Sequence, residues 1–257
     1  MARYLLKALN TIYLMIVTLS NLTDALSWPS MFIIGYIATC AILTMYQADF
    51  KRLYIINPPY KFFLRIVTIL HNIGLILYSA ITCGQIVYEL YHGRANEPYM
   101  MNLCWLFTYS KIWEFLDTYL ILAKGQPTIF LQKYHHVGAL VCWWLCCYYD
   151  AKFICMTVLY NSIIHTIMYS YYLASLLGYK WTSIKIYITS LQLVQFFGGA
   201  WSCWQYYYKP LLATEPSVEF LLSDGEFISV TLFHVYLTGL VILFLQFFIK
   251  EYFMKKN

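Results

Sequence analysis

The stretch 227–249, FISVTLFHVYLTGLVILFLQFFI, contains no Asp, Glu, Lys or Arg. A helix that crosses the hydrocarbon core of a bilayer needs about 20 predominantly apolar residues, so this stretch is typical of a membrane-spanning helix. Other predominantly apolar stretches, some with a few charged residues, precede it at 28–46, 65–89, 100–123, 128–149, 153–177 and 183–206. The sequence therefore predicts an all-α fold, that of a polytopic integral membrane protein with seven transmembrane helices.

The composition agrees with a membrane protein and excludes two other classes. The chain is 61% hydrophobic and 11% charged, whereas soluble domains carry about 25% charged residues. A soluble globule could not bury so much apolar surface, and a disordered chain would not contain it. The net charge of +5 lies in short loops rather than in a basic patch, so we expect no nucleic-acid partner. The eight Cys form no CxxC pair and are typical of small core residues.

The orientation follows from Lys and Arg, which favour cytosolic loops. One set of loops contains Lys51, Arg52, Lys61, Lys124, Lys180, Lys250, Lys255 and Lys256, and the opposite set contains Arg94, Lys152 and Lys209. We therefore expect a lumenal or interfacial segment at 1–27, a membrane domain at 28–250 and a cytosolic C-terminal tail at 251–257. Residues 1–20 resemble a signal peptide without a clear cleavage site, which favours a retained interfacial helix.

Polar side chains recur on one face of four predicted spans, where ionisable groups are costly and indicate function. These residues are Lys111, Glu114, Asp117 and Thr118; Gln132, His135 and His136; Asn161, His165, Met168, Tyr169 and Tyr172; and Thr189, Gln192 and Gln195. All four sets lie in the cytosolic half of the membrane, which predicts a shared cavity. Some of these residues, Thr189 and Gln195 above all, could serve only as hydrogen bonds between helices. His71 and His234 are isolated on apolar helices, and we interpret both as structural.

Three imidazoles beside carboxylates permit two kinds of chemistry. One is metal binding, as in membrane di-iron desaturases and hydroxylases, whose boxes need far more histidines than this chain has. The other is nucleophilic and acid–base catalysis by His, which we favour because Gln132, a poor ligand, begins the cluster. A seven-helix transporter or receptor is a further alternative, although no internal repeat or broken helix is evident.

Four motifs in this region resemble those of the fatty-acid elongase family, the ELO or ELOVL condensing enzymes of the endoplasmic reticulum. Lys111 to Thr118 is similar to KxxExxDT, and Gln132 to His136 is similar to HxxHH with Gln in place of the first His. Asn161 to Tyr172 is similar to NxxxHxxMYxYY, and Thr189 to Gln192 is similar to TxxQ. They occur in the family's order, and the resemblance covers roughly residues 28–250.

The resemblance implies a 3-ketoacyl-CoA synthase, an acyltransferase that condenses a long-chain acyl-CoA with malonyl-CoA. It also implies that helices two to seven form a barrel around an acyl tunnel, that the enzyme is in the endoplasmic reticulum membrane, and that no metal or cofactor is needed. We expect ketoacyl reductase, dehydratase and enoyl reductase partners, membrane lipid contacts and possible homodimerisation. The final lysines, Lys255 and Lys256, are displaced by one position from the family's dilysine retrieval signal.

Within this scheme each candidate residue has an expected role. His135 would carry the acyl group, and His136 would hold or deprotonate His135. His165 and Asn161 would stabilise the enolate. The residues expected to orient substrate are Lys111, Glu114, Asp117, Thr118, Gln132, Tyr169, Tyr172, Thr189 and Gln192. Those expected to bind the CoA phosphates are Lys124, Lys180 and Lys185. The acyl tail would run toward the lumen past Phe196 and Gly199, with Trp201 and Trp204 either closing the tunnel or anchoring the lumenal interface.

Overall fold

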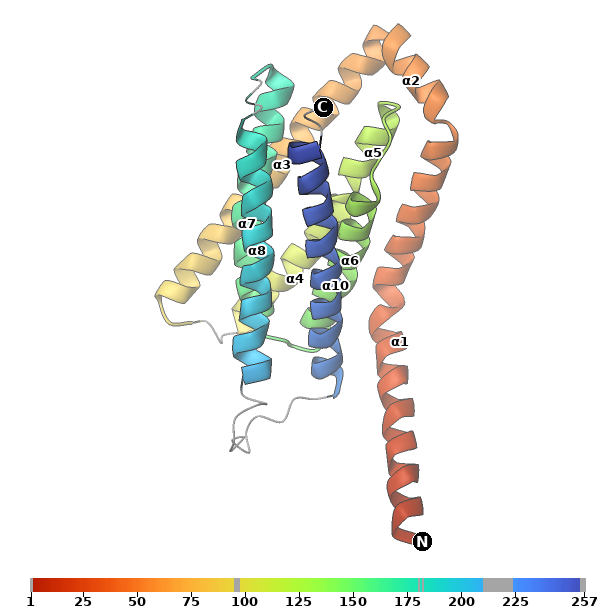
Figure 1. Ribbon diagram of the computed structural model, residues 1–257, viewed down its shortest axis with the longest axis vertical. Coiled ribbons are helices and arrows are strands. Elements are labelled where there is room, and N and C mark those ends of the chain that lie inside the picture. The colour runs from red at the N-terminus through yellow and green to blue at the C-terminus, as the bar shows by residue number, and fades with distance from the viewer. Residues whose placement is uncertain (1, 95–97, 180, 182, 210–223, 255–257) are drawn as a thin grey trace.

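The computed structural model describes residues 2–94, 98–179, 181, 183–209 and 224–254, with side chains from residue 21 onward except at 208 and 224. Helices make up nearly all of this part of the chain, and no strand occurs in it (Figure 1). The helices are α1 (Ala2–Met45), α2 (Gln47–Ile56), α3 (Pro58–Tyr91), α4 (Pro98–Trp113), α5 (Phe115–Ala123), α6 (Phe130–Tyr148), α7 (Ile154–Leu177), α8 (Ile184–Cys203) and α10 (Asp224–Ile249), with short π-helices η1 (Trp204–Tyr208) and η2 (Lys250–Met254). The all-α expectation is confirmed.

Local sequence explains where several of these helices begin and end. Asn57 caps α3 by accepting a hydrogen bond from the Tyr60 amide at 3.0 Å, and Pro58 occupies the first helical position. Gly178 ends α7 with φ +109°, a left-handed conformation that glycine adopts without strain. The start of α8 at Ile184 and the end of α3 at Tyr91 lie within two residues of the predicted limits, whereas α3 starts at Pro58, seven residues before its predicted start, because the cap lies outside the apolar stretch.

The expected span 100–123 is divided at Glu114 into α4 and α5. The amide of Asp117 donates to the carbonyl of Glu114 at 3.0 Å, a bond between residues three apart that tightens the turn. No Pro or Gly occurs in the divided stretch, so its sequence gives no sign of the break. The turn lies beside the polar groups described below.

Helix packing brings the polar faces together. Contacts between neighbours run from α3 to α7, α8, α10, α6 and α4, and α4 returns to α3. Helix α1 lies at the edge, against α5 and α6, and its N-terminal part extends well beyond the other helices (Figure 1). It continues without a break through residue 28, where we expected the membrane domain to start.

Three helical stretches of the described residues are long and apolar enough to cross a membrane: Asn21–Met45, Pro58–Tyr91 and Gly225–Met254. The protein is therefore a membrane protein by the length and composition of its helices. Helices α6, α7 and α8 carry the polar faces, and these residues lower their mean hydropathy.

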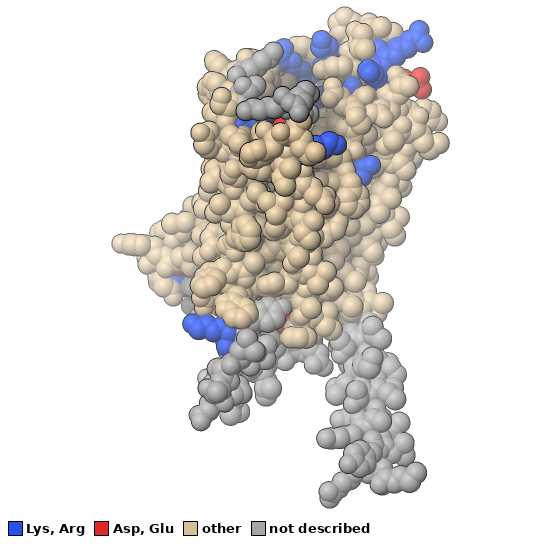
Figure 2. Space-filling model, viewed as in Figure 1, with Lys and Arg blue, Asp and Glu red and all other residues tan. Residues whose placement is uncertain are grey.

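Lys and Arg gather at one end of the molecule in the view of Figure 2, over α2. At this end α2 contacts the loop that follows α5, because the Gln47 side-chain amide donates to the Gly125 carbonyl at 3.4 Å. Between the two ends, the visible surface carries almost no charge (Figure 2). This distribution suits a chain whose middle lies in lipid.

Candidate functional site

A cavity of about 860 Å³ lies between α5, α6, α7, α8 and the C-terminal end of α10. Its lining includes members of all four predicted polar sets, namely Glu114, Asp117, Gln132, His135, His136, His165, Met168, Tyr169, Tyr172, Thr189, Gln192 and Gln195. The polar faces therefore meet at one cavity, as their spacing and depth predict. Ile164, Ile188 and Phe244 supply apolar wall beside them.

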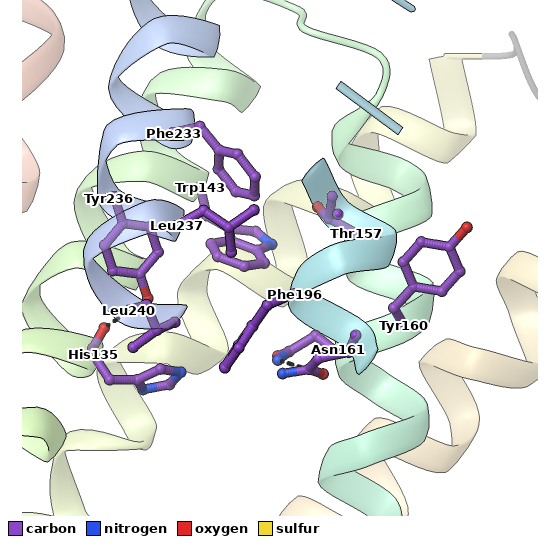
Figure 3. A pocket seen from close by; sticks show the side chains of 12 residues that line it. His135, Trp143, Thr157, Tyr160, Asn161, Phe196, Phe233, Tyr236, Leu237 and Leu240 are labelled. Carbon is purple, nitrogen blue, oxygen red and sulfur yellow. Dashed lines mark hydrogen bonds between the residues drawn. The ribbon is translucent and has the colours of Figure 1, made fainter. Parts of the chain in front are cut away.

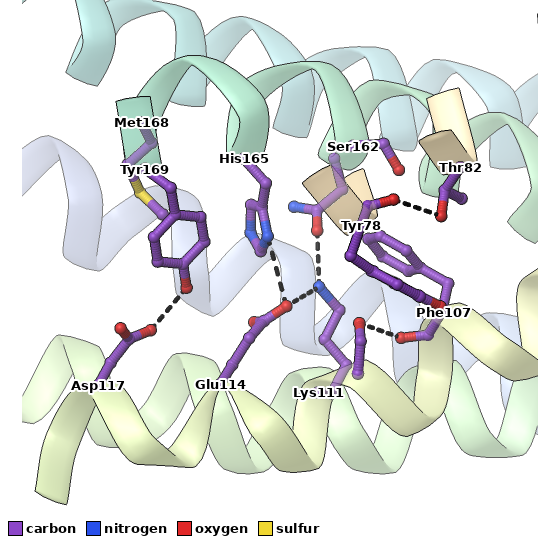
Figure 4. A network of polar contacts seen from close by, with 12 residues as sticks. Tyr78, Thr82, Phe107, Lys111, Glu114, Asp117, Ser162, His165, Met168 and Tyr169 are labelled. Atoms are coloured by element: carbon purple, nitrogen blue, oxygen red, sulfur yellow. Dashed lines mark hydrogen bonds and ion pairs between the residues drawn. The ribbon is translucent and has the colours of Figure 1, made fainter. Parts of the chain in front are cut away.

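A buried network of charged and amide groups extends from Glu114 and His165, which line the cavity, to Lys111 behind them (Figure 4). Lys111 Nζ donates to Glu114 Oε1 at 2.8 Å and to Asn161 Oδ1 at 2.7 Å. His165 Nδ1 lies 3.3 Å from the same Glu114 oxygen. The side chains of Lys111 and Glu114 are each 1% exposed. Multiple partners offset the cost of removing this ion pair from water, and they fix His165 relative to α4.

A second network surrounds Asp117. Its Oδ1 lies 2.8 Å from His71 Nε2, and its Oδ2 accepts a hydrogen bond from the Tyr169 hydroxyl at 2.6 Å. His71 was expected to be structural only, yet it contacts a residue that lines the cavity. The signal was present, because an ionisable side chain within a membrane span indicates function by default. Its isolation on 65–89 concealed the partner, which comes from another helix.

The paired histidines on α6 have different surroundings. His135 lines the cavity and points toward Phe196 and Asn161 (Figure 3). The Tyr236 hydroxyl donates to the backbone carbonyl of His135 at 3.3 Å. His136 also lines the cavity, and its ring centroid lies 5.5 Å from that of His135. His135 is therefore the histidine of the pair that lies nearest the inner end of the cavity.

Beyond His135 lies a narrow pocket of only about 20 Å³ (Figure 3). His135, Gln195 and Phe196 line both it and the large cavity. Such a volume holds about one water molecule, so the expected open tunnel toward the lumen is absent from the described part of the structure. The reason is that aromatic rings fill the space, those of Trp143, Phe196, Phe233 and Tyr236.

Trp201 on α8 and Trp204 at the start of η1 lie away from the narrow pocket. Trp201 is 60% exposed and Trp204 is 43% exposed, and neither lines the cavity or the pocket. Both lie on the outer surface, which is the arrangement of interface anchors. Phe196 and Gly199 do line the narrow pocket, as expected.

Several predicted residues lie away from the cavity surface or at its rim. Thr118 is fully buried and pairs with the Tyr36 hydroxyl at 2.9 Å, so it faces α1 rather than substrate. Thr189 pairs with the Tyr252 hydroxyl at 3.2 Å. Lys124 and Lys185 line the cavity near η2, and burial lowers the pKa of Lys124, with Asp117 acting in the opposite direction. Lys180 lies outside the described residues.

Within the described ranges, no group of three or more His, Cys, Asp and Glu side chains could hold a metal ion. The side chains at the cavity can themselves supply nucleophilic and acid–base chemistry. Two imidazoles on separate helices could act as nucleophile and acid–base catalyst, and the amides of Asn161 and Gln195 could hold a carbonyl oxygen.

A family model described as ELO: GNS1/SUR4 family matches residues 21–257. The chain belongs to this family. Among its relatives, this GNS1/SUR4 family member is 33% identical to fatty acid elongase sre1 of Dictyostelium discoideum, over 51% of this chain and 55% of the relative. It is 32% identical to very long chain fatty acid elongase 2 of Rattus norvegicus, over 52% of this chain and 54% of the relative.

A third relative, very long chain fatty acid elongase 5 of Mus musculus, is 33% identical to the GNS1/SUR4 family member over 49% of this chain and 48% of the relative. The match spans about half the length of each of these curated relatives. No solved structure matches the chain.

Proposed function

We propose that this protein condenses a long-chain acyl-CoA with malonyl-CoA to give a 3-ketoacyl-CoA two carbons longer, releasing CoA and carbon dioxide. The observation that carries the proposal is the convergence of His135 from α6 and His165 from α7 on one cavity beside the amide of Gln195, with the amide of Asn161 at the narrow pocket that adjoins it. The family relationship and the names of the relatives support the same reaction.

The first half-reaction forms an acyl-histidine. An imidazole nitrogen of His135 attacks the thioester carbonyl, the carbon–sulfur bond breaks, and CoA leaves as a thiol with the imidazole proton. His136, whose ring lies beside that of His135, assists the proton transfer. The apolar surroundings strengthen each polar contact with the reacting carbonyl.

In the second half-reaction malonyl-CoA loses carbon dioxide, and the electron pair of the broken carbon–carbon bond forms an enolate. His165 and Asn161 hold the thioester oxygen on which negative charge develops. The enolate carbon attacks the acyl carbon, the carbon–nitrogen bond breaks, and His135 regains a proton. Asp117, Gln132, Tyr169, Tyr172 and Gln192 line the cavity and orient the two substrates.

The membrane arrangement of the proposal has seven crossings, with the helices from α3 to α10 around the acyl chain and the C-terminus in the cytosol. CoA would lie at the mouth beside Lys124 and Lys185, whose charge suits its phosphates. The location is the endoplasmic reticulum membrane, with the reductases and dehydratase of the elongation cycle as partners and no resident metal. A homodimer is compatible with this arrangement.

The test is a condensation assay on purified protein in lipid nanodiscs. Palmitoyl-CoA with malonyl-CoA labelled in its methylene carbon should give a labelled 3-ketoacyl-CoA with two more carbons, and His135→Ala should abolish it. His234→Ala provides the matched control, because His234 lines neither cavity. Strong chelators should leave turnover unchanged. No product from wild type, or loss of stoichiometric iron together with activity, would contradict the proposal.

A further inference from the structure

His71 joins three helices at a single carboxylate. It lies on α3 with a side chain that is 1% exposed, and its Nε2 is 2.8 Å from Asp117 Oδ1. The other carboxylate oxygen accepts the Tyr169 hydroxyl at 2.6 Å, from α7. With its proton on Nε2, the ring of His71 donates to this carboxylate oxygen, which accepts.

The surroundings of His71 hold the ring in one orientation. Its centroid lies 6.1 Å from that of Trp113 and 6.1 Å from that of Tyr169, with interplanar angles of 74° and 89°. Trp113 can approach α3 because residue 74, three positions after His71, is a glycine. A Cβ atom at Gly74 would lie 2.5 Å from the indole of Trp113. No hydrogen-bond partner for Nδ1 exists among the described residues. The polar contact of this ring is therefore the one with Asp117.

The contact extends to the catalytic histidine. The Tyr169 ring, fixed at its hydroxyl by Asp117, packs edge-on against the His165 ring with centroids 5.4 Å apart. His165 is held on another side by Glu114, 3.3 Å away. Movement of Asp117 would thus loosen Tyr169 and, through it, one wall of the His165 site.

We propose that His71 is a positioning residue for the condensation, acting through Asp117 and Tyr169 on His165. This inference rests on the function proposed above. His71 then contributes to the reaction although its side chain does not line the cavity. Asp117 does line the cavity, and its side chain is 20% exposed. A purely structural role would tie α3 to α5 without influence on turnover.

The experiment compares two replacements of the same residue in the purified enzyme. His71→Phe keeps a planar ring and removes the donor, and we expect kcat to fall 10- to 100-fold at an unchanged KM for acyl-CoA, the order of loss that misplacement causes. His71→Gln keeps an amide N–H near the position of Nε2 and should restore most of kcat. His234→Phe, the control on an apolar helix, should have wild-type kcat.

A double-variant cycle connects the effect to Asp117. If His71 acts through that carboxylate, His71→Phe combined with Asp117→Asn should lose no more kcat than Asp117→Asn alone. Multiplicative losses, or wild-type kcat in a folded His71→Phe protein, would overturn the inference while the proposed function stands. Equal losses in the Phe and Gln variants, matched by equal losses of thermal stability, would also overturn it, as a structural role only. A wild-type protein without condensation activity would instead refute the proposed function, and this inference with it.

Discussion

Lys111 and Glu114 illustrate how single residues define this site. An ion pair removed from water to 1% exposure at both side chains is stable only if other partners complete its hydrogen bonds. Asn161 accepts a hydrogen bond from Lys111, and His165 Nδ1 lies 3.3 Å from Glu114; both residues belong to the candidate catalytic set. The pair therefore couples the stability of the helix packing to the geometry of the reacting groups.

Removing one member of this pair should be more harmful than removing both. Glu114→Gln or Lys111→Met leaves an uncompensated buried charge, at a cost of about 3–5 kcal/mol, whereas the double variant leaves none. We expect a large loss of melting temperature in each single variant and a smaller loss in the double variant than in either single variant, measured by thermal unfolding in detergent. Additive losses would show that the two charges are not coupled.

At this scale the sequence predicted which residues share a helix face, but not what each face contacts. Spacing and depth placed His135, His165 and Gln192 at one cavity. Thr118 follows Asp117 by one residue, which is about 100° around a helix, so it turns to α1. We interpreted His71 as structural because its partner, Asp117, lies on another helix. Spacing along the sequence carries no information about contacts between helices.

At the scale of elements, α8 carries two adjacent phenylalanines with opposite surroundings. Phe196 is 6% exposed and lies between the large cavity and the narrow pocket, whereas Phe197 is 60% exposed. Trp201, five residues after Phe196, is about 140° around the helix, which explains why it reaches the outer surface. Because of this rotation, Trp201 does not face the space in which an acyl chain would end.

An acyl tail directed toward the lumen must displace Phe196. Phe196→Ala removes the ring and opens the narrow pocket, so the product distribution should move toward longer chains by one or more two-carbon cycles. Phe197→Ala is the matched control and should leave the distribution unchanged. Gas chromatography of the product acyl chains provides the measurement. Identical profiles for the two variants, with activity retained, would exclude Phe196 as the barrier.

Helices α6 and α10 approach each other through glycines covered by tyrosines. A Cβ atom on Gly138 would collide with the ring of Tyr236, whose hydroxyl reaches the carbonyl of His135. Gly138→Ala should therefore lower both the melting temperature and turnover. Gly84→Ala, with nothing within 4 Å of its Cβ position, should be neutral or stabilising by up to about 1 kcal/mol. The same response in both variants would show that the close approach is not required.

The elements themselves could be predicted well, because long apolar stretches specify helices strongly. The break at Glu114 could not, since the stretch carries no Pro or Gly and His165, which lies 3.3 Å from Glu114, comes from another helix. The aromatic filling beyond His135 was likewise hidden, because Trp143 and Phe233 come from different helices.

At the scale of the whole molecule, charge sets the orientation. Lys124 and Lys185 line the cavity. The loop that follows Lys124 touches α2, the helix that contains Lys51 and Arg52. Basic residues favour the cytosolic side, so α2, the mouth and the C-terminus should face the cytosol. This places the mouth of the cavity where soluble CoA esters are available.

The orientation predicts the accessibility of a C-terminal tag. Antibody should reach the tag in cells whose plasma membrane alone is permeabilised, while a lumenal marker in the same cells remains protected. A tag that is detected only after all membranes are opened would reverse the orientation, and with it the side from which CoA enters.

The central claim is that this cavity transfers an acyl group through His135. The most direct measurement is intact-mass and peptide mass spectrometry of purified protein incubated with palmitoyl-CoA alone. We predict one acyl group on the peptide that contains His135, absent from His135→Ala and removed by malonyl-CoA with formation of the two-carbon-longer 3-ketoacyl-CoA. Turnover without any acyl-protein species, or an acyl group on a cysteine that malonyl-CoA discharges equally well in His135→Ala, would contradict the account.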